Sequence, residues 1–299
     1  MRKIIIIIGV IVVIISLFLF FVGRTKDESQ SLQNRLEKAG LTIKNGDLKK
    51  AEEIYKNIIR ECKNSEDAVL AMEGLANLYY MQNQLLKAKN LYKDIINQYP
   101  ENDIIRKIQK KLWQLEIDIL FSGIVTENSA IYEVQPGDTL SKIARKFNTT
   151  VSLIKRCNDL KSDTIRPNNR LKVVTVGFSI IIDKSQNVLT LKANDEVLKI
   201  YTVSTGEDNH TPTGELKIVN KLKNPVWYKA GAIVPAESPK NILGSRWLGL
   251  SIKGYGIHGT TDPESLGKQI TEGCIRMSNK DVEELFTIVP RGTKVTIVD

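Results

Sequence analysis

The pattern of hydrophobic and polar residues divides this chain of 299 residues into four stretches, each predicting a different kind of structure. Residues 4–22 are uncharged and almost wholly apolar, whereas residues 27–122 place their apolar side chains at a helical period. Residues 131–175 combine short strand and helix patterns, and residues 177–298 alternate apolar and polar positions as strands do. We therefore expect a multidomain protein with an N-terminal transmembrane helix, an all-α repeat region, a small α+β module (βααβ) and an all-β, sandwich-like domain.

The apolar stretch over residues 4–22 predicts a membrane anchor. As an α-helix it would be about 29 Å long, which matches the roughly 30 Å hydrocarbon core of a bilayer. Arg2 and Lys3 precede it and favour a cytosolic N-terminus. A cleaved signal peptide is the alternative, but its apolar run usually has about 7–15 residues and ends at a small-residue site, which is missing after Val22. We expect residues 1–26 to form a cytosolic tip and a single-pass anchor in the cell membrane, with all later residues on its outer side.

Residues 27–122 contain an internal repeat, because segment 45–59 aligns with segment 82–96 at an offset of 37 residues. Matching positions carry the same residue in the pairs Leu48/Leu85, Ala51/Ala88, Tyr55/Tyr92, Ile58/Ile95 and Ile59/Ile96. Small residues where helices cross and large residues that fill the groove are typical of stacked helix pairs. The region resembles tetratricopeptide repeats, and residues 104–121 have one apolar face that would cap the stack.

A plain helical stalk is the alternative to such repeats. Repeats would offer a docking groove to a possible protein partner, whereas a stalk would serve only as a spacer. The residues leave both readings open.

Residues 131–175 predict a strand–helix–helix–strand module. A strand begins at Tyr132, a Pro-Gly turn follows, and Asp138 is placed to cap the first helix. Apolar residues at i, i+3, i+4 and i+7 from Leu140 share one face of that helix, and residues 171–173 form the closing strand. The module resembles the LysM family, whose members bind polymers that contain N-acetylglucosamine, such as peptidoglycan.

The LysM resemblance implies glycan contacts in two loops, with candidates at Gly137, Asp138, Thr139, Asn158 and Ile165. Family members usually have Gly-Gln before the last strand, where this chain has Asn168 and Asn169. A small domain that packs but no longer binds glycan is the alternative.

The alternating stretch predicts hairpins in a β core. Strand patterns over residues 178–182, 188–192, 197–201 and 216–219 are separated by polar turn residues. Residues 224–245 are rich in Gly, Pro and Ala, and they form either a loop that covers the substrate or an ordinary long connection.

The formal net charge of +9 is spread unevenly over the chain. Residues 131–176 carry +5, whereas residues 177–299 carry only +1. No basic helix and no stripe of aromatic and arginine residues appears in the sequence, so we expect no nucleic-acid partner. A basic module on the outer face of a membrane more plausibly meets an anionic wall polymer or lipid headgroups.

Three cysteines and two histidines limit the available chemistry. Cys62, Cys157 and Cys274 form neither a disulfide framework nor a zinc pattern, and Cys62 and Cys157 are interpreted as buried apolar residues. His210 and His258 are the only histidines and do not have HExxH-type spacing, which disfavours a zinc-dependent peptidase. We expect no metal and no cofactor.

One of these cysteines lies in a reactive setting. Cys274 follows Gly273 in the sequence TEGCIRM, and His258 lies sixteen positions upstream in the sequence YGIHGT. A thiol attacks carbonyls as the thiolate, so it needs a base or a positive charge nearby, and His258 is the candidate base. Gly273 would let backbone N–H groups face an oxyanion, and Arg276 would hold a carboxylate by its two-pronged guanidinium. A buried structural cysteine beside a turn histidine is the alternative.

These motifs resemble the L,D-transpeptidase (YkuD-type) family, whose signature is His-Gly followed by Ser/Thr-x-Gly-Cys-hydrophobic-Arg/Asn. Three further segments match family blocks in order and spacing, namely Thr211–Glu215, Leu243–Gly249 and Pro290–Thr293. Many members carry a second histidine before the Gly-Cys pair, where this chain has Glu272. The resemblance covers residues 177–298 and implies a β-sandwich with the catalytic segment at one end.

The resemblance also implies a substrate and a set of roles. The substrate is the peptide stem of peptidoglycan on the cell-wall side of the membrane; a thioester forms with loss of D-alanine, and a neighbouring stem then accepts the acyl group. The implied roles are Cys274 as nucleophile, His258 as proton carrier, Gly259 as backbone orienter, Gly273 at the oxyanion, Arg276 in substrate positioning and Thr271 in loop support. Hydrolysis of the same thioester would make the protein an L,D-carboxypeptidase, and a non-catalytic wall-binding scaffold is the third alternative.

Overall fold

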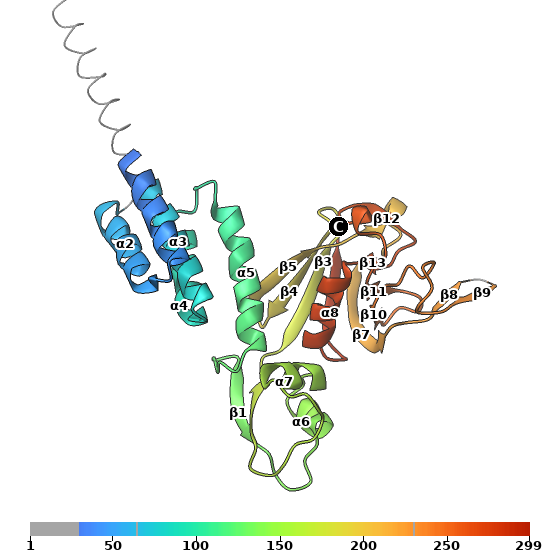
Figure 1. Ribbon diagram of the computed structural model, residues 1–299. Coiled ribbons are helices and arrows are strands. Elements are labelled where there is room, and N and C mark those ends of the chain that lie inside the picture. The colour runs from blue at the N-terminus through green and yellow to red at the C-terminus, as the bar shows by residue number, and fades with distance from the viewer. Residues whose placement is uncertain (1–29, 64, 230) are drawn as a thin grey trace, which may run out of the picture. The chain divides into compact units, whose positions relative to one another are not determined.

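The structure, a computed structural model, describes residues 30–299 apart from residues 64 and 230 (Figure 1). The described chain forms two compact units, one ending at Leu112 and the other running from Trp113 to Asp299. No helix among these described residues is long and apolar enough to cross a bilayer. The anchor predicted over residues 4–22 lies outside the described residues.

The first unit is a stack of helices. Residues 30–44 are helical, and they are followed by α2 (Leu48–Glu61), α3 (Glu66–Met81), α4 (Leu85–Gln98) and the start of α5 (Ile105–Phe121). Three of the five pairs that repeat at an offset of 37 are buried in both copies, namely Ala51/Ala88, Tyr55/Tyr92 and Ile58/Ile95. Leu48, Ile59 and Ile96 of the other two pairs are half-buried. Gly74 lets the Tyr55 ring lie against α3, because a Cβ at this glycine would come within 2.5 Å of that ring. Matching burial at a fixed offset is what stacked repeats require.

Helix α5 contributes its two halves to different units. Ile108 and Leu112 are buried in the first unit, as expected for a helix that caps the stack. In the second unit, Ile117 and Leu120 belong to the main hydrophobic core. Besides the face that packs on the stack, this helix therefore has a second buried face, which the sequence analysis did not predict.

The small module has the strand–helix–helix–strand order that the sequence predicts. It consists of β1 (Ser129–Glu133), α6 (Leu140–Lys146), α7 (Val151–Cys157) and β2 (Arg170–Val174), with β1 and β2 antiparallel. The expected cap is wrong by one residue: Thr139 Oγ1 accepts the Lys142 N–H and caps α6. Asp138 instead closes the Pro-Gly turn, where its Oδ2 accepts the Gln135 N–H and the Tyr132 hydroxyl.

The turn before β2 keeps its shape without a glycine. Asn168 has a φ of +68°, a left-handed conformation that asparagine tolerates better than other residues with a side chain. Its backbone N–H donates to the Val134 carbonyl, and Val134 N–H donates to the Asn169 carbonyl. Asn168 therefore adopts the left-handed conformation that suits the glycine expected here from the LysM resemblance.

Strand β2 is buried on both faces and joins the module to the rest of the second unit. Leu171 and Val173 face the module's own core, while Val174 packs in the main core. Helix α7 is divided in the same way, with Ile154 in the module core and Leu153 and Cys157 in the main core. The module and the β-rich domain therefore share packed side chains.

Lys172 strengthens this junction. Its side chain is 2% exposed, and its Nζ donates to the carbonyls of Ile119, Leu120 and Ser122 at 3.0, 3.1 and 2.7 Å. These carbonyls lie at the C-terminal end of α5, where a helix leaves its last carbonyl groups without internal partners. Lys172 therefore caps α5 from inside the small module.

Replacing Lys172 by methionine should destabilise the second unit. The variant keeps the apolar stem but removes a donor from all three carbonyls. Ile119 and Leu120 keep other donors, from Ser122 and Cys157, whereas the Ser122 carbonyl loses its donor, which should cost about 2 kcal/mol. Urea unfolding followed by circular dichroism would measure this loss. Lys161→Met, at an exposed lysine of the same module, is the matched control and should change stability by less than about 0.5 kcal/mol. Equal effects of the two substitutions would contradict the role of Lys172.

The β-rich domain is built on one ordered set of strands. Within the described chain, eight strands are hydrogen-bonded in the order β13-β11-β10-β7-β14-β3-β4-β5 (Figure 1). Their bounds are β3 (Phe178–Asp183), β4 (Val188–Ala193), β5 (Glu196–Thr202), β7 (Gly214–Lys223), β10 (Arg246–Leu250), β11 (Gly256–His258), β13 (Ile275–Arg276) and β14 (Lys294–Val298). The predicted hairpins are confirmed, since β4 is antiparallel to both β3 and β5.

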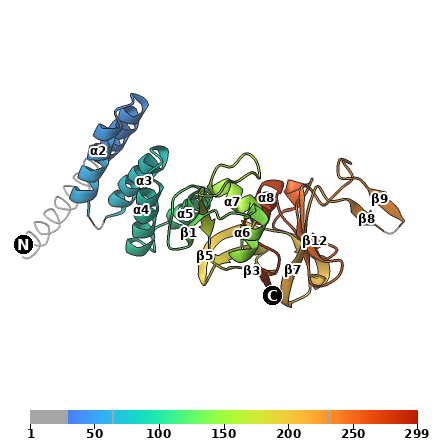
Figure 2. The same cartoon turned by 90° about the horizontal axis from the view of Figure 1, so that it is seen from below.

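Strand β7 is the corner of this domain. Its first half pairs with β14 and its second half pairs with β10, which divides the strands into two half-sheets. Helix α8 (Asn279–Ile288) packs its buried residues Val282, Leu285 and Phe286 into the same core. Figure 2 shows α8 beside α7 and the strands. The expectation of an all-β domain is therefore corrected: the domain is β-rich and contains a core helix.

Residues 224–245 hold a short hairpin, β8 (Trp227–Lys229) with β9 (Ala232–Val234). The hairpin extends from the domain on the side of β7 and β10 (Figure 1). Tyr228 and Ile233 are largely exposed on it.

Candidate active site

Cys274 lies in a tight loop between β12 (Gln269–Thr271) and β13, held by the Thr271 side chain. The Thr271 hydroxyl donates to the Cys274 carbonyl at 2.6 Å and accepts the Gly273 N–H at 3.2 Å. Gly273 has a φ of +120°, and a Cβ there would come within 2.7 Å of the Tyr255 ring and 3.0 Å of the His210 carbonyl. Only glycine fits this position, so the residue before the sulfur is fixed by geometry and by space.

His258 lies at the end of β11 and is 2% exposed. Its Nδ1 is 2.7 Å from the Gly259 carbonyl. A carbonyl can only accept, so Nδ1 carries the proton and the neutral ring keeps its lone pair on Nε2. The Trp247 ring stacks on the imidazole with 5.8 Å between centroids, and Gly256 leaves room for that ring. The tautomer and the orientation of the imidazole are therefore both set by neighbours.

The thiol and the imidazole line the same pocket, which has a volume of about 690 Å³. Strands β11 and β13 are parallel neighbours with Ile257 opposite Ile275. His258 follows Ile257 and Cys274 precedes Ile275, so the two side chains reach the pocket from adjacent segments. Glu272 and Arg276 line the pocket as well. Its other walls are mostly apolar and come from Leu222, Val226, Trp227, Tyr228, Ile242, Leu243, Trp247 and Ile270.

Burial keeps both reactive groups uncharged at rest. It lowers the pKa of His258 to about 4, although the Gly259 carbonyl opposes the shift by favouring the charged ring. Burial also raises the pKa of the Cys274 thiol, against the opposing effect of the Gly256 N–H. The thiol donates to the Gly254 carbonyl at 3.6 Å. The resting site is therefore a neutral thiol beside a neutral imidazole.

The Arg276 guanidinium is held by one hydrogen bond and also has a donor without a partner within the described chain. Its Nη1 donates to the Ser265 hydroxyl at 3.0 Å, and its backbone exchanges two hydrogen bonds with Ser204. Its Nε is buried and has no hydrogen-bond partner within the described chain. A buried donor without a partner at the wall of a pocket suits an anionic ligand group.

The expected glycan contacts of the small module differ in availability. Gly137 and Thr139 are exposed, whereas the Asp138 carboxylate is bound to its own turn. The Asn158 amide is already hydrogen-bonded inside the module. Its Nδ2 donates to the Ile154 and Lys172 carbonyls, and its Oδ1 accepts the Lys172 N–H. Ile165 packs against the module core. The loop at residues 137–139 leads into Leu140 and the loop after Asn158 contains Ile165, and both of these apolar residues pack in the module core.

Asn279, at the start of α8, supports the histidine segment and was not identified from the sequence. Its Oδ1 accepts the Ser245 N–H and its Nδ2 donates to the Thr260 carbonyl, both at 2.9 Å. Gly244 and Gly259 allow this approach, because a Cβ at either would collide with Oδ1. The Ser278 cap followed by apolar residues at helical spacing was the available signal for α8.

Three family models match the chain. The L,D-transpeptidase catalytic domain matches residues 177–297, the LysM domain matches residues 132–174, and the tetratricopeptide repeat matches residues 42–112.

The chain is also similar to individual proteins. YkuD of Bacillus subtilis, which bears the name of an L,D-transpeptidase, is 36% identical over 173 residues that cover 56% of this chain and 97% of that protein. YqjB of the same organism, named likewise, is 42% identical over 126 residues that cover 40% of this chain and 70% of that protein. A solved L,D-transpeptidase from Mycobacterium tuberculosis H37Rv has a TM-score of 0.36 and 14% identity, and the match covers 46% of this chain and 75% of that chain.

Proposed function

Because this chain belongs to the L,D-transpeptidase family, we propose that it cross-links peptidoglycan stems through a thioester on Cys274. The donor is a tetrapeptide stem, and the bond attacked joins its third residue to the terminal D-alanine. The observation that carries the proposal is the pocket shared by the Cys274 thiol and the His258 imidazole, in which Nδ1 is already committed to the Gly259 carbonyl. Nε2 is thereby left as the base.

In the proposed first half-reaction, the proton leaves the thiol as the new C–S bond forms. Nε2 takes this proton, and the imidazolium then gives it to the nitrogen of the departing D-alanine. The backbone N–H of Cys274 would stabilise the oxyanion, and loss of one such donor typically costs about 3–4 kcal/mol. Arg276 would hold the donor carboxylate through its unpaired Nε, which has no partner within the described residues.

In the second half-reaction, the amine of a neighbouring stem's third residue attacks the thioester. His258 takes a proton from that amine, the C–S bond breaks, and the thiol is restored. A cross-link between two third residues results. Water can use the same thioester, which would make the chain an L,D-carboxypeptidase, and the two outcomes differ only in the nucleophile that reaches the carbonyl.

The pH dependence of D-alanine release should report the buried imidazole. A neutral ring is needed as base, and the pKa of His258 is lowered to about 4 by burial. Below that pH the ring is protonated and inactive, and above it the ring is neutral, so kcat/KM should lose half its value only near pH 4. A loss centred at pH 6.5 or above would contradict a base buried in this way.

We further propose that residues 4–22 anchor the chain in the cell membrane with the catalytic domain on the cell-wall side, where the small module binds N-acetylglucosamine-containing glycan. The basic charge of that module supports contact with an anionic wall polymer. Protease added to intact cells should then cleave the chain outside the membrane. Purified wall should retain the wild type more strongly than Thr139→Asp, which keeps an oxygen to cap α6 but places a negative charge at the proposed contact. Equal retention would count against glycan binding at this loop.

For the helical repeats, we propose a protein partner that presents an acidic, partly apolar segment. Helices α2, α3 and α4 line a groove of about 680 Å³. Ile59, Leu75 and Leu91 form its apolar part, and Lys56, Arg60 and Lys87 surround it. A synthetic peptide of alternating Glu and Leu should bind the wild type more tightly than Lys87→Glu, and equal binding would count against the groove.

The direct test of the enzymatic proposal uses the full chain in mild detergent with tetrapeptide muropeptides. Mass spectrometry of the products should reveal cross-linked dimers and free D-alanine. Tripeptide without dimers would favour the carboxypeptidase. If neither product formed with the wild type, the chain would instead act as a wall-binding scaffold.

A further inference from the structure

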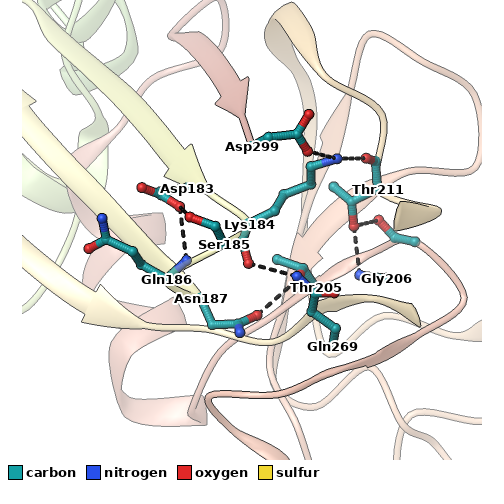
Figure 3. A network of polar contacts seen from close by, with 11 residues as sticks. Asp183, Lys184, Ser185, Gln186, Asn187, Thr205, Gly206, Thr211, Gln269 and Asp299 are labelled. Atoms are coloured by element: carbon teal, nitrogen blue, oxygen red, sulfur yellow. Dashed lines mark hydrogen bonds and ion pairs between the residues drawn. The ribbon is translucent and has the colours of Figure 1, made fainter. Parts of the chain in front are cut away.

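Thr211 is a fully buried residue that the proposed mechanism has not used. It is 0% exposed and begins a Thr-Pro segment between β6 (Thr205–Gly206) and β7. Its hydroxyl accepts the Gly206 N–H at 2.7 Å and donates to the Gly273 carbonyl at 2.8 Å (Figure 3). An amide N–H can only donate and a carbonyl can only accept, so the direction of the hydroxyl proton is fixed.

The bond to Gly273 sets the orientation of the peptide group that precedes the sulfur. The described chain contains no cis peptide bond. In a planar trans peptide, the Gly273 carbonyl and the Cys274 N–H point in opposite directions. The hydroxyl that holds the carbonyl therefore also aims the Cys274 N–H away from Thr211.

This N–H is the donor that the loop leaves available. The Gly273 N–H is bound to the Thr271 hydroxyl. No hydrogen bond from the Cys274 N–H to another described residue is found, and Cys274 precedes the paired residues of β13. An oxyanion that forms at a carbonyl attacked by the sulfur would lie next to this same residue.

Lys184 fixes Thr211 from the other side. Its Nζ is buried and donates to the Thr211 carbonyl at 3.1 Å, and it pairs with the Asp299 carboxylate at 2.7 Å (Figure 3). The Lys184 carbonyl accepts the Gln269 side chain at 3.0 Å, and Gln269 begins β12, which leads to the nucleophile loop. Both the side chain and the backbone of Thr211 are therefore restrained.

We propose that Thr211 is a positioning residue for the acyl transfer, which orients the Cys274 N–H toward the oxyanion through the Gly273 carbonyl. It touches neither the substrate nor the sulfur. The inference rests on the proposed function, because an oxyanion forms only if Cys274 attacks a carbonyl.

Thr211→Val tests the inference because it keeps the shape and removes the hydroxyl. Its kcat for D-alanine release should fall about 10²-fold, the usual effect of a lost or misplaced oxyanion donor, with KM changed less than about threefold. Alkylation of Cys274 by iodoacetamide should keep its wild-type rate, since displacement of iodide develops no oxyanion. Thr211→Ser, which retains the hydroxyl, should stay within about fivefold of wild-type kcat.

Thr293→Val is the matched control, because Thr293 is also buried and its hydroxyl donates only to the Pro290 carbonyl of its own turn. It should leave kcat unchanged. Wild-type kcat in Thr211→Val would overturn the inference, as would equal losses of kcat and alkylation rate. If the wild type released no D-alanine, the proposed function would fail instead.

If Thr211→Val does not fold, Lys184→Met tests the inference instead. It leaves the hydroxyl in place but frees the Thr211 carbonyl, so kcat should fall about tenfold while alkylation is unchanged. Unchanged kcat in a folded Lys184→Met would overturn the inference.

Discussion

Replacing Cys274 by alanine or serine should lower kcat/KM for D-alanine release by about 10⁵-fold or more. Alanine has no nucleophile. Serine has one, but its hydroxyl is far less acidic than a thiol, and a buried imidazole whose pKa is lowered to about 4 is too weak a base to activate it. Release of D-alanine from a tetrapeptide stem, followed by mass spectrometry, measures the loss.

Cys62→Ser is the matched control for the cysteine variants. Cys62 lies in the helical unit and is partly exposed, and it forms no disulfide. This variant should keep wild-type kcat/KM. Turnover by Cys274→Ser at the wild-type rate would show that the reaction does not need the Cys274 sulfur.

Replacing His258 by glutamine should lower kcat by about 10³-fold, within the usual range for loss of a general base. The residual activity should then rise with pH, because without a base the reaction depends on the small thiolate fraction. The pKa of the Cys274 thiol is raised by burial, so this rise should continue above pH 9. The acid limb near pH 4 should disappear from the profile.

His210→Gln is the control for the histidine variant. The His210 side chain is exposed, and only its backbone approaches Gly273. Its pH profile should match the wild type. A His258→Gln variant that kept the limb near pH 4 would show that another group supplies the base.

The sequence predicted the elements whose signals are local. The repeat positions such as Ala51/Ala88, the order of the small module and the first hairpins of the β domain depend on residues close together in the chain. The two reactive residues were also identified from their motifs, and they do line one pocket.

The features that the sequence analysis missed depend on contacts between distant segments. Lys172 reads as a surface lysine of a strand, and only the fold brings the end of α5 against it. Asn279 and Thr211 act on backbone groups of loops far away in sequence. The cap of α6 was placed one residue early, because Asp138 and Thr139 are both good caps and the Pro-Gly turn competes for the carboxylate.

The charge state of the site also required the structure. A cysteine beside a histidine suggests a thiolate–imidazolium pair at rest, whereas burial favours the neutral forms of both side chains. In the proposed mechanism the proton would move during the attack itself, and the fixed tautomer of His258 would leave Nε2 ready to accept it.

The core that the small module shares with the catalytic strands links the proposed glycan binding to catalysis. Leu153 and Cys157 of the small module pack in the same core as the catalytic strands. A glycan held by the module would therefore stay close to the catalytic domain, which would raise the effective concentration of its stems.

The proposed function depends on acylation of one sulfur, and the mass of the peptide that carries this sulfur tests it most directly. The full chain is mixed with tetrapeptide stem, quenched in acid within one turnover and digested. We predict an added mass equal to the stem without its D-alanine, carried by the peptide that contains Cys274 and absent from Cys274→Ala. Turnover without any adduct on that peptide, or an adduct mapped to another residue, would contradict the central claim.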